Sequence, residues 1–190
     1  PGRKWWRGRG GTGTSTLPPQ RLLELIAPEC NADQIPMPAP YSQHISELEA
    51  PSGALVFYGA IDSAYLPDNF PGHWQRDASD PGSVFISISR EGDGRAPKGQ
   101  ATVIASVFTT PKGWFSGSEP EYQSKKKACQ AKIRSEVEAA LGLSDHTWRH
   151  QELATPRGFL RWTGRPNGIV GGLGQSPSRF GPFGLASRTP

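Results

Sequence analysis

Residues 84–109 read VFISISREGDGRAPKGQATVIASVFT, and they decide the fold because both halves have the pattern of a β-strand. Large aliphatic side chains alternate with other residues over 84–89, which is the period of a half-buried strand. Residues 101–109 are rich in β-branched side chains and are apolar on both faces. Between them, the sequence EGDGR at 91–95 is a strong turn signal. The stretch therefore predicts an antiparallel hairpin with a long tip.

Further strands are expected on both sides of this hairpin. Ala54–Ile61 (ALVFYGAI) is a short apolar run with aromatic residues, and it predicts a strand that a loop over 62–83 joins to the hairpin. A short strand is expected near 147–154. The glycine-rich run Ile169–Gly174, which follows an Asn-Gly turn, predicts one more.

The clearest helix is predicted over 119–141. Ser118 and Glu121 have the spacing of a capping box, Pro120 suits the first turn, and Gly142 is placed to end the helix. Shorter helical segments are expected at 20–27, near 42–49 and at 157–163, the last one ended by Gly164. One apolar stripe of the long helix comprises Tyr122, Cys129, Ile133, Val137, Ala140 and Leu141.

Together these elements predict an α+β fold with an antiparallel or mixed sheet flanked by helices. The chain has 190 residues with 23 Gly and 19 Pro, which excludes a coiled coil or a long helical bundle because both residues break helices. Its 8 Phe, 6 Trp and 4 Tyr exclude a wholly disordered chain, since they supply apolar surface for a core. The sequence contains no run of about 20 apolar residues, so we expect no membrane-spanning helix.

The net charge of +4 is unevenly distributed. Residues 1–23 and 153–190 each hold five basic residues and no acidic one, whereas residues 24–152 hold eleven basic and seventeen acidic residues. Cationic ends of this kind can bind phosphate groups or a membrane surface. The two cysteines, Cys30 and Cys129, are in no metal-binding or redox spacing, and they fit a reducing compartment better than a disulfide.

Residues 1–13 leave three interpretations open. Gly8–Gly13 matches G-x-G-x-x-G, but neither the preceding strand nor the following helix of a dinucleotide site is present in the sequence pattern. The basic residues beside Trp5 and Trp6 could instead bind single-stranded nucleic acid through phosphate contacts and stacking. A flexible basic terminus without a ligand is the third interpretation.

No motif with a reactive side chain is found. His146 and His150 are four residues apart, but a strand is expected there, on which the two side chains are too far apart to chelate a metal well. Residues 125–127, three consecutive lysines, are interpreted as a solvated helix face, with a phosphate or membrane surface as the alternative. The sequence has no G-x-S-x-G and no Walker motif, so we predict no catalytic side chain and no metal ligand.

The C-terminal part carries a resemblance. The run TPRGFLRWTGRPNGIVGGLGQ at 155–175 and FGPFGLASRTP at 180–190 resemble the phytoene desaturase/carotenoid isomerase family of FAD-dependent oxidoreductases, and most of all the bacterial, mainly cyanobacterial, C-3′,4′ carotenoid desaturases. PSGALVFYG at 51–59, the segment from Ser89 to Phe108, and LPPQ at 17–20 with the leucines after it are similar too. The resemblance covers about 14–190.

The resemblance implies the substrate-binding domain of a flavin amine-oxidase-like oxidoreductase, without the two motifs that hold FAD in such enzymes. On this interpretation 1–13 is an unmatched basic, glycine-rich and disordered terminus, and 14–52 is a short helix with a proline-rich loop. Residues 53–165 are then the substrate-binding domain, and 166–190 return toward the flavin-binding portion. A sheet with one face covered and the other lining a cavity would be apolar on both faces, as 54–61 and 101–109 are. A sheet buried between two layers would have the same pattern.

Resemblance further implies that FAD does the chemistry and that a long carotenoid lies in an apolar tunnel beside it. The residues expected to line the tunnel are Phe57, Tyr58, Phe108, Trp162, Phe180 and Phe183. Those expected near the flavin are Gly171, Gly172, Gly184 and Arg188. Glycines would let the backbone approach the flat flavin ring, although a bulge or turn would require them equally.

Three functions remain open at this point. The first is a portion of an FAD-dependent carotenoid desaturase or isomerase. The second is a non-catalytic binding domain or remnant without flavin, and the third is a basic nucleic-acid-binding protein built on residues 1–13. No signal-peptide pattern follows the first basic residues, so a cytoplasmic location is expected. Contact with a membrane surface is also expected, because the cationic C-terminal stretch lies beside Phe180 and Phe183 and carotenoids dissolve in lipid.

Overall fold

A computed structural model describes residues 21–22, 43, 45, 47, 52–68, 70–90, 92–144 and 147–171. The chain divides into two compact units, one made of 1–48 with 186–190 and the other of 49–185. In the first unit the described residues are Arg21, Leu22, Gln43, Ile45 and Glu47, and all are helical, in agreement with the predicted helical segments. The fold described below belongs to the second unit.

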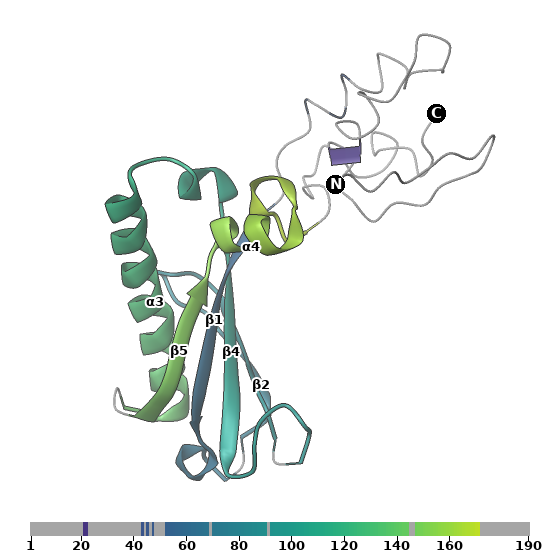
Figure 1. The fold of residues 1–190 in the computed structure, drawn as a ribbon. Helices are drawn as coiled ribbons and strands as arrows, with labels where there is room; N and C mark the ends of the chain where they lie inside the picture. Colours follow the sequence, from purple (N-terminus) through teal and green to yellow (C-terminus); the bar gives the residue numbers. More distant parts are fainter. Residues whose placement is uncertain are drawn as a thin grey trace, which may run out of the picture. The chain divides into compact units, whose positions relative to one another are not determined.

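Five strands form one antiparallel sheet, in the order β2-β3-β4-β1-β5 (Figure 1). With the helices that follow, this confirms the α+β fold and the antiparallel sheet. The strands are β1 (Gly53–Asp62), β2 (His73–Arg76), β3 (Val84–Ile88), β4 (Gln100–Thr109) and β5 (Trp148–Ala154).

The hairpin predicted from 84–109 is present as β3 and β4, which pair antiparallel from Phe85 opposite Ser106 to Ile88 opposite Val103. The loop predicted over 62–83 is not wholly irregular. It contains the 3₁₀ turn η2 (Ser63–Tyr65) and the edge strand β2, whose sequence HWQR has no apolar alternation to reveal it. Pairing with β3 makes it a strand, so tertiary context overrides the weak local pattern.

Helix α3 (Glu119–Leu141) begins and ends where the sequence predicts. The Ser118 hydroxyl accepts the backbone N–H of Glu121 at 3.5 Å, and the Glu121 carboxylate accepts the backbone N–H of Ser118 at 2.6 Å. These two bonds are the reciprocal pair of a capping box. At the other end, Gly142 has a φ of 67°, a left-handed conformation that glycine adopts without strain.

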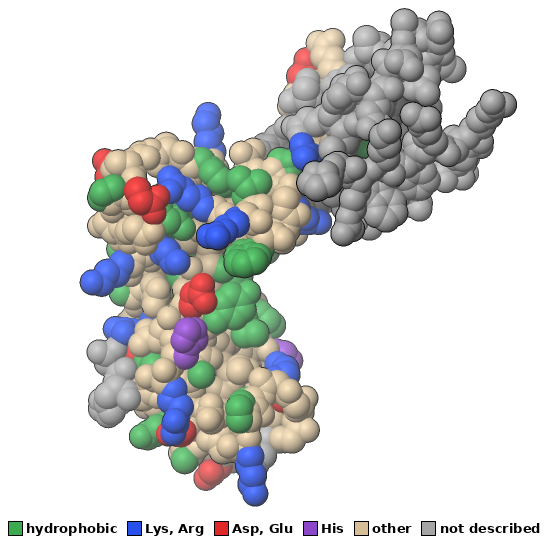
Figure 2. Space-filling model, viewed as in Figure 1, with side chains coloured by type: hydrophobic (Ala, Val, Ile, Leu, Met, Phe, Trp, Pro, Cys, Tyr) green, Lys and Arg blue, Asp and Glu red, His purple; other side chains and the backbone are tan. Residues whose placement is uncertain are grey.

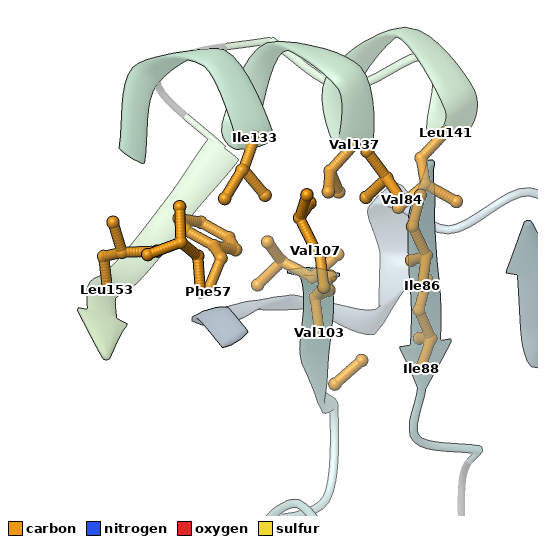
Figure 3. Close-up of a cluster of buried hydrophobic side chains, with 14 of the residues drawn as sticks. Phe57, Val84, Ile86, Ile88, Val103, Val107, Ile133, Val137, Leu141 and Leu153 are labelled. Carbon is orange, nitrogen blue, oxygen red and sulfur yellow. The ribbon is translucent and has the colours of Figure 1, made fainter. Parts of the chain in front are cut away.

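Packing of α3 against one face of the sheet forms the hydrophobic core. Ile133, Val137 and Leu141 point from the helix toward the strands (Figure 3). Three of the six residues in the predicted stripe are thus buried, and Tyr122, Cys129 and Ala140 pack partly buried against the same cluster. The strand residues beneath the helix are Leu55, Phe57, Ile61, Val84, Ile86, Ile88, Ala101, Val103, Ala105, Val107 and Leu153.

The segment after β5 lies at one end of β1. Helix α4 (Pro156–Thr163) ends at Gly164, as predicted, and η5 (Pro166–Gly168) follows it. Gly168 has a φ of 61°, and a Cβ there would lie 1.8 Å from the carbonyl oxygen of Pro156, so only glycine fits. In place of the predicted strand 169–174, Ile169 forms a single bridge to Gly53 within the described residues, while 172–174 lie outside them.

Between β4 and α3 lies the 3₁₀ turn η3 (Pro111–Trp114), which carries the buried Trp114. Lys125 fastens this turn to the helix, because its ammonium group donates to the carbonyl of Gly113 at 2.7 Å and lies 4.5 Å from the centre of the Trp114 ring. Among the described helices, none is both long and apolar enough to cross a bilayer.

Candidate functional site

The face of the sheet opposite α3 is the candidate site, and we call it the open face. β4 shows why this face exists, since its residues alternate between buried side chains toward α3 and less buried ones on the other side. Directly opposite residues of an antiparallel pair share a face, so the register extends this assignment to the neighbouring strands. The open face comprises Ala54, Val56, Tyr58, Ala60, Phe85, Ser87, Thr102, Ile104, Ser106, Phe108, His150 and Glu152.

Aromatic side chains stand exposed on this face. Tyr58, Phe85 and Phe108 are 39, 43 and 78 % exposed. Hydrophobic side chains gather over β1 and β4 in the middle of the face, with a histidine and an acidic side chain beside them (Figure 2). The face therefore has an apolar centre, and the polar His150 and Glu152 of β5 form one of its borders.

A half-open hollow of about 410 Å³ lies on the open face over residues 58–60 of β1 and 102–104 of β4, beside the hairpin tip that carries Arg95. Its volume falls at the lower end of the roughly 300–1,000 Å³ that is usual for small-molecule sites. The register explains its floor, because the small Ala60 and Thr102 lie opposite each other on β1 and β4 and leave space between larger neighbours. The hollow is lined by Tyr58, Gly59, Ala60, Arg95, Thr102, Val103, Ile104 and His150.

Arg95 reaches this hollow from the tip of the β3–β4 hairpin. Its Nε donates to the carboxylate of Asp93 at 2.8 Å, and its Nη2 donates to the carbonyl of Ile88 at 2.9 Å. Nη2 also lies 2.7 Å from the Asp93 carboxylate, and Nη1 lies 3.5 Å from the Ser87 hydroxyl. The guanidinium group is thus held against β3 by three residues of its own hairpin.

Asp93 organises the hairpin tip. Besides the Arg95 side chain, its carboxylate accepts the backbone N–H groups of Arg95 at 2.9 Å and of Arg90 at 2.7 Å. These hydrogen bonds lower the pKa of Asp93 to about 2, because they stabilise the charged carboxylate. The bond from the Arg95 side chain has the largest effect. The ion pair with Arg95 is therefore formed at neutral pH.

Two further contacts border the open face. At the far end of β1, Arg149 donates to both carboxylate oxygens of Asp62, at 2.6 and 3.0 Å, and this pair raises the pKa of Arg149. On β2 and β3, the rings of His73 and Phe85 stack with their centres 5.9 Å apart. A charged pair thus lies at one end of the apolar centre, and the ring of His73 lies beside Phe85 at the β2 side.

The structure brings two of the predicted tunnel residues to this face and moves one away from it. Tyr58 and Phe108 lie on the open face. Phe57 is fully buried in the core beneath α3, because successive strand residues point to opposite faces. Its ring lies nearly perpendicular to that of Trp148, with the ring centres 5.1 Å apart. We therefore reassign Phe57 from the lining to the core.

Trp162 lies on α4, is 82 % exposed and has Arg161 over its ring. Phe180 and Phe183 lie outside the described residues.

The residues expected near a flavin are mostly beyond the described part of the chain. Gly172, Gly184 and Arg188 lie outside it, and Gly171 is exposed, with no atom of a described residue near its Cβ position. The carbonyl of Gly171 accepts a hydrogen bond from Arg165 at 3.3 Å. Of the four residues expected near a flavin, the structure thus places Gly171 alone.

The other candidates from the sequence fall partly inside and partly outside the described residues. Within the residues that the structure describes, no group of His, Cys, Asp and Glu could hold a metal; His150 is described and His146 is not. Cys129 is a free thiol packed against the core, and burial raises its pKa. Cys30 and the basic residues of 1–13 lie outside the described range.

Sequence reasoning missed Ile104, Phe85, Arg95 and His150 as members of the site. The first two could have been found by carrying the two-residue alternation from Tyr58 and Phe108 across the paired strands. Arg95 gives no such signal, because its position depends on how the hairpin tip folds back. His150 needed the register of β5 on β1, which the bulge after Ala60 shifts.

Comparison with known proteins adds no relative: no protein-family model matches the chain, and no curated protein matches it. The open face, with its apolar centre and bordered hollow, is thus the observation from which a function is inferred.

Proposed function

We propose that the open face binds a long, apolar polyene, and that the chain is the substrate-binding portion of an FAD-dependent carotenoid desaturase or isomerase. The proposal is supported by the sequence resemblance and by one structural observation, the exposed aromatic and aliphatic centre of the face opposite α3. Contiguous exposed apolar surface is uncommon on a protein that has no partner for it, and it marks a binding site.

The chemistry of the face suits such a ligand. A polyene has almost no hydrogen-bonding groups, so its site must gain affinity from apolar contact. Tyr58, Ile104 and Phe108 provide aromatic and branched aliphatic surface on adjacent strands. The charged Arg95 and Asp62 are neutralised by Asp93 and Arg149, so an apolar chain can lie beside these two pairs without burying an unpaired charge there.

A binding titration tests the proposal. A carotenoid dispersed in mild detergent is added to the chain, and quenching of tryptophan fluorescence reports the affinity. Because one aromatic anchor typically contributes at least about 1.4 kcal/mol, we expect Phe108→Ala and Tyr58→Ala each to weaken binding about tenfold. Tyr65→Ala is the matched control, since Tyr65 is 52 % exposed but lies on η2. Equal affinities for all four proteins would contradict the proposal.

A non-catalytic polyene-binding domain without flavin is the alternative, supported by the apolar centre of the open face, which could hold a polyene without a cofactor. Addition of FAD to the purified chain separates the two. Flavin absorbance that remains with the protein after gel filtration supports the enzyme portion. A colourless protein that still binds the carotenoid supports the alternative.

A further inference from the structure

We infer that the open face binds a second copy of this chain, face to face, when no ligand covers it. The two protomers are related by a two-fold axis that runs along β4 and passes through Ile104. The pairing itself does not depend on the proposed function. One consequence rests on that function: a polyene on the same face competes with the second copy, so binding of the ligand separates the two protomers.

One row of side chains crosses the open face from edge to edge. The register of the strands determines this row, because directly opposite residues of an antiparallel pair share a face. β4 is the middle strand of the five, so the row has its centre on β4. From β2 to β5, the row comprises His73, Ser87, Ile104, Tyr58 and Glu152. It therefore begins with an imidazole at one edge of the sheet and ends with a carboxylate at the other.

A two-fold axis along β4 makes this row complementary to itself. The axis exchanges the two edges of the sheet, so His73 of one protomer faces Glu152 of its partner, and the symmetry repeats this pair. By the same operation the hydroxyl of Tyr58 faces that of Ser87, and Ile104 faces its own copy. Sheets packed in this aligned way lie about 10 Å apart, a distance that an imidazole and a carboxylate side chain can bridge together.

The other face-to-face arrangement, with the two-fold axis running across the strands, is disfavoured by the same residues. It places Glu152 over Glu152 of the partner, and two carboxylates in this position repel each other. Within the described part of the chain, neither the imidazole of His73 nor the carboxylate of Glu152 has a hydrogen-bonding partner. Both groups are exposed and available to a second protomer.

The centre of the face supplies the apolar surface that such a dimer buries (Figure 2). Phe85 and Val56 both lie opposite Ser106, on either side of β4, so the axis packs Phe85 against Val56 of the partner. Each residue of a sheet covers about 16 Å² of its face, so the five strands present roughly 600 Å² per protomer. A dimer then buries roughly 1,200 Å² in total, which is the lower limit for a specific interface. We therefore expect a weak dimer.

Sedimentation velocity of the full chain tests the pairing by an exchange of charges. The natural chain is expected to be monomeric at about 1 µM and largely dimeric at about 100 µM, the range of a weak interface. His73→Glu brings two carboxylates together at both ends of the row, so the dissociation constant should rise at least about tenfold. Adding Glu152→His to this variant restores the opposite groups, and the constant should return to within about threefold of the natural value.

Ala128→Glu is the matched control. Ala128 is exposed on α3, which covers the other face of the sheet, so the added carboxylate should leave the dissociation constant unchanged. Circular dichroism verifies that each variant is folded. The pairing is refuted if the natural chain stays monomeric at about 100 µM, if Ala128→Glu weakens the dimer as much as His73→Glu does, or if the double variant is not restored.

A carotenoid in mild detergent, added to the dimer, separates this inference from the proposed function, with detergent alone as the reference. Separation into monomers that carry the carotenoid supports both. A dimer that persists while tryptophan fluorescence is unchanged refutes polyene binding, and the pairing stands. A monomeric natural chain that binds the carotenoid refutes the pairing, and the proposed function stands. A dimer that persists with the carotenoid bound refutes the competition for one face.

Discussion

At the scale of single residues, Gly59 shows how closely the sheet and its core are packed. A Cβ at this position would lie 2.2 Å from the ring of Trp148. That ring cannot easily move away, because its Nε1 donates to the Glu138 carboxylate at 2.7 Å. The ring also packs against Phe57, with the two ring planes nearly perpendicular. Glycine is thus required here by the tryptophan of the neighbouring strand and not by an unusual backbone angle.

Gly59→Ala is therefore expected to lower the free energy of unfolding by roughly 1–3 kcal/mol, the usual cost of overpacking a core. Gly158→Ala is the matched control: Gly158 is inside α4, and no atom lies within 4 Å of its Cβ position. Alanine favours a helix over glycine, so this variant should gain roughly 0.5–1 kcal/mol. Urea unfolding measures both, and a loss of equal size in the two variants would contradict the packing argument.

Asp93 allows a prediction on pH. Its pKa of about 2 lies below the ordinary 3.8, so its contribution to stability is complete above the ordinary value and is lost as the pH falls through about 2. Carboxyl carbon shifts followed by NMR during an acid titration measure this pKa. Arg95→Ala removes the largest cause and should raise the pKa toward 3.8, whereas Lys98→Ala should leave it near 2. An unchanged value in Arg95→Ala would show that the backbone bonds alone hold the carboxylate.

At the scale of elements, the start of α3 is determined locally. The Ser118 hydroxyl also donates to Glu121 at 2.8 Å, and the bonds from the Ser118 backbone N–H and hydroxyl lower the pKa of Glu121. The stability that this carboxylate adds is therefore present above its ordinary pKa and lost as the pH falls through the lowered one. Such a cap satisfies backbone donors that the helix itself leaves unpaired.

Ser118→Ala should consequently lower the free energy of unfolding by about 1 kcal/mol. Ser124→Ala, an exposed change of the same kind inside the same helix, should leave it equal or slightly raise it, since alanine is the better helix former. Thermal unfolding followed by circular dichroism compares the two. If both variants lose the same stability, the cap does not act as the geometry indicates.

At the scale of the whole sheet, the two faces differ in how deeply their side chains are buried. Phe57 and Phe108 are the same residue type on adjacent strands, yet the first is fully buried beneath α3 and the second is 78 % exposed on the open face. The covered face provides the stability of the fold. The open face is then available for binding, because it is not needed for the core.

Phe57→Ala is expected to destabilise the protein by about 3–5 kcal/mol, because it leaves a cavity in the core. Phe108→Ala should change the free energy of unfolding by no more than about 0.5 kcal/mol, since the side chain is exposed. Equilibrium unfolding in urea gives both values. A large loss in Phe108→Ala would show that the open face is packed against something, and the site would have to be placed elsewhere.

Much of the fold could be predicted from local pattern. The hairpin, the boundaries of α3 and the end of α4 follow from alternation, capping residues and glycines, all of which act within a few residues of chain. β2 could not be predicted, because it becomes a strand only by pairing with β3. Of the site, Tyr58 and Phe108 were predicted, whereas Phe57 was not separable from Tyr58 without knowing which face α3 covers.

The sequence by itself determined the β3–β4 hairpin, the strands β1 and β5 and the helices α3 and α4, and that β1 and β4 are apolar on both faces. Only the tertiary structure decided which of those faces becomes core and which stays exposed, and it alone placed Arg95 and His150 beside the same hollow. The physical reason is the distance along the chain over which each kind of interaction acts. Strand and helix signals arise from neighbours in the chain, whereas a face is chosen by contacts between segments that are far apart in sequence and whose register the pattern does not encode.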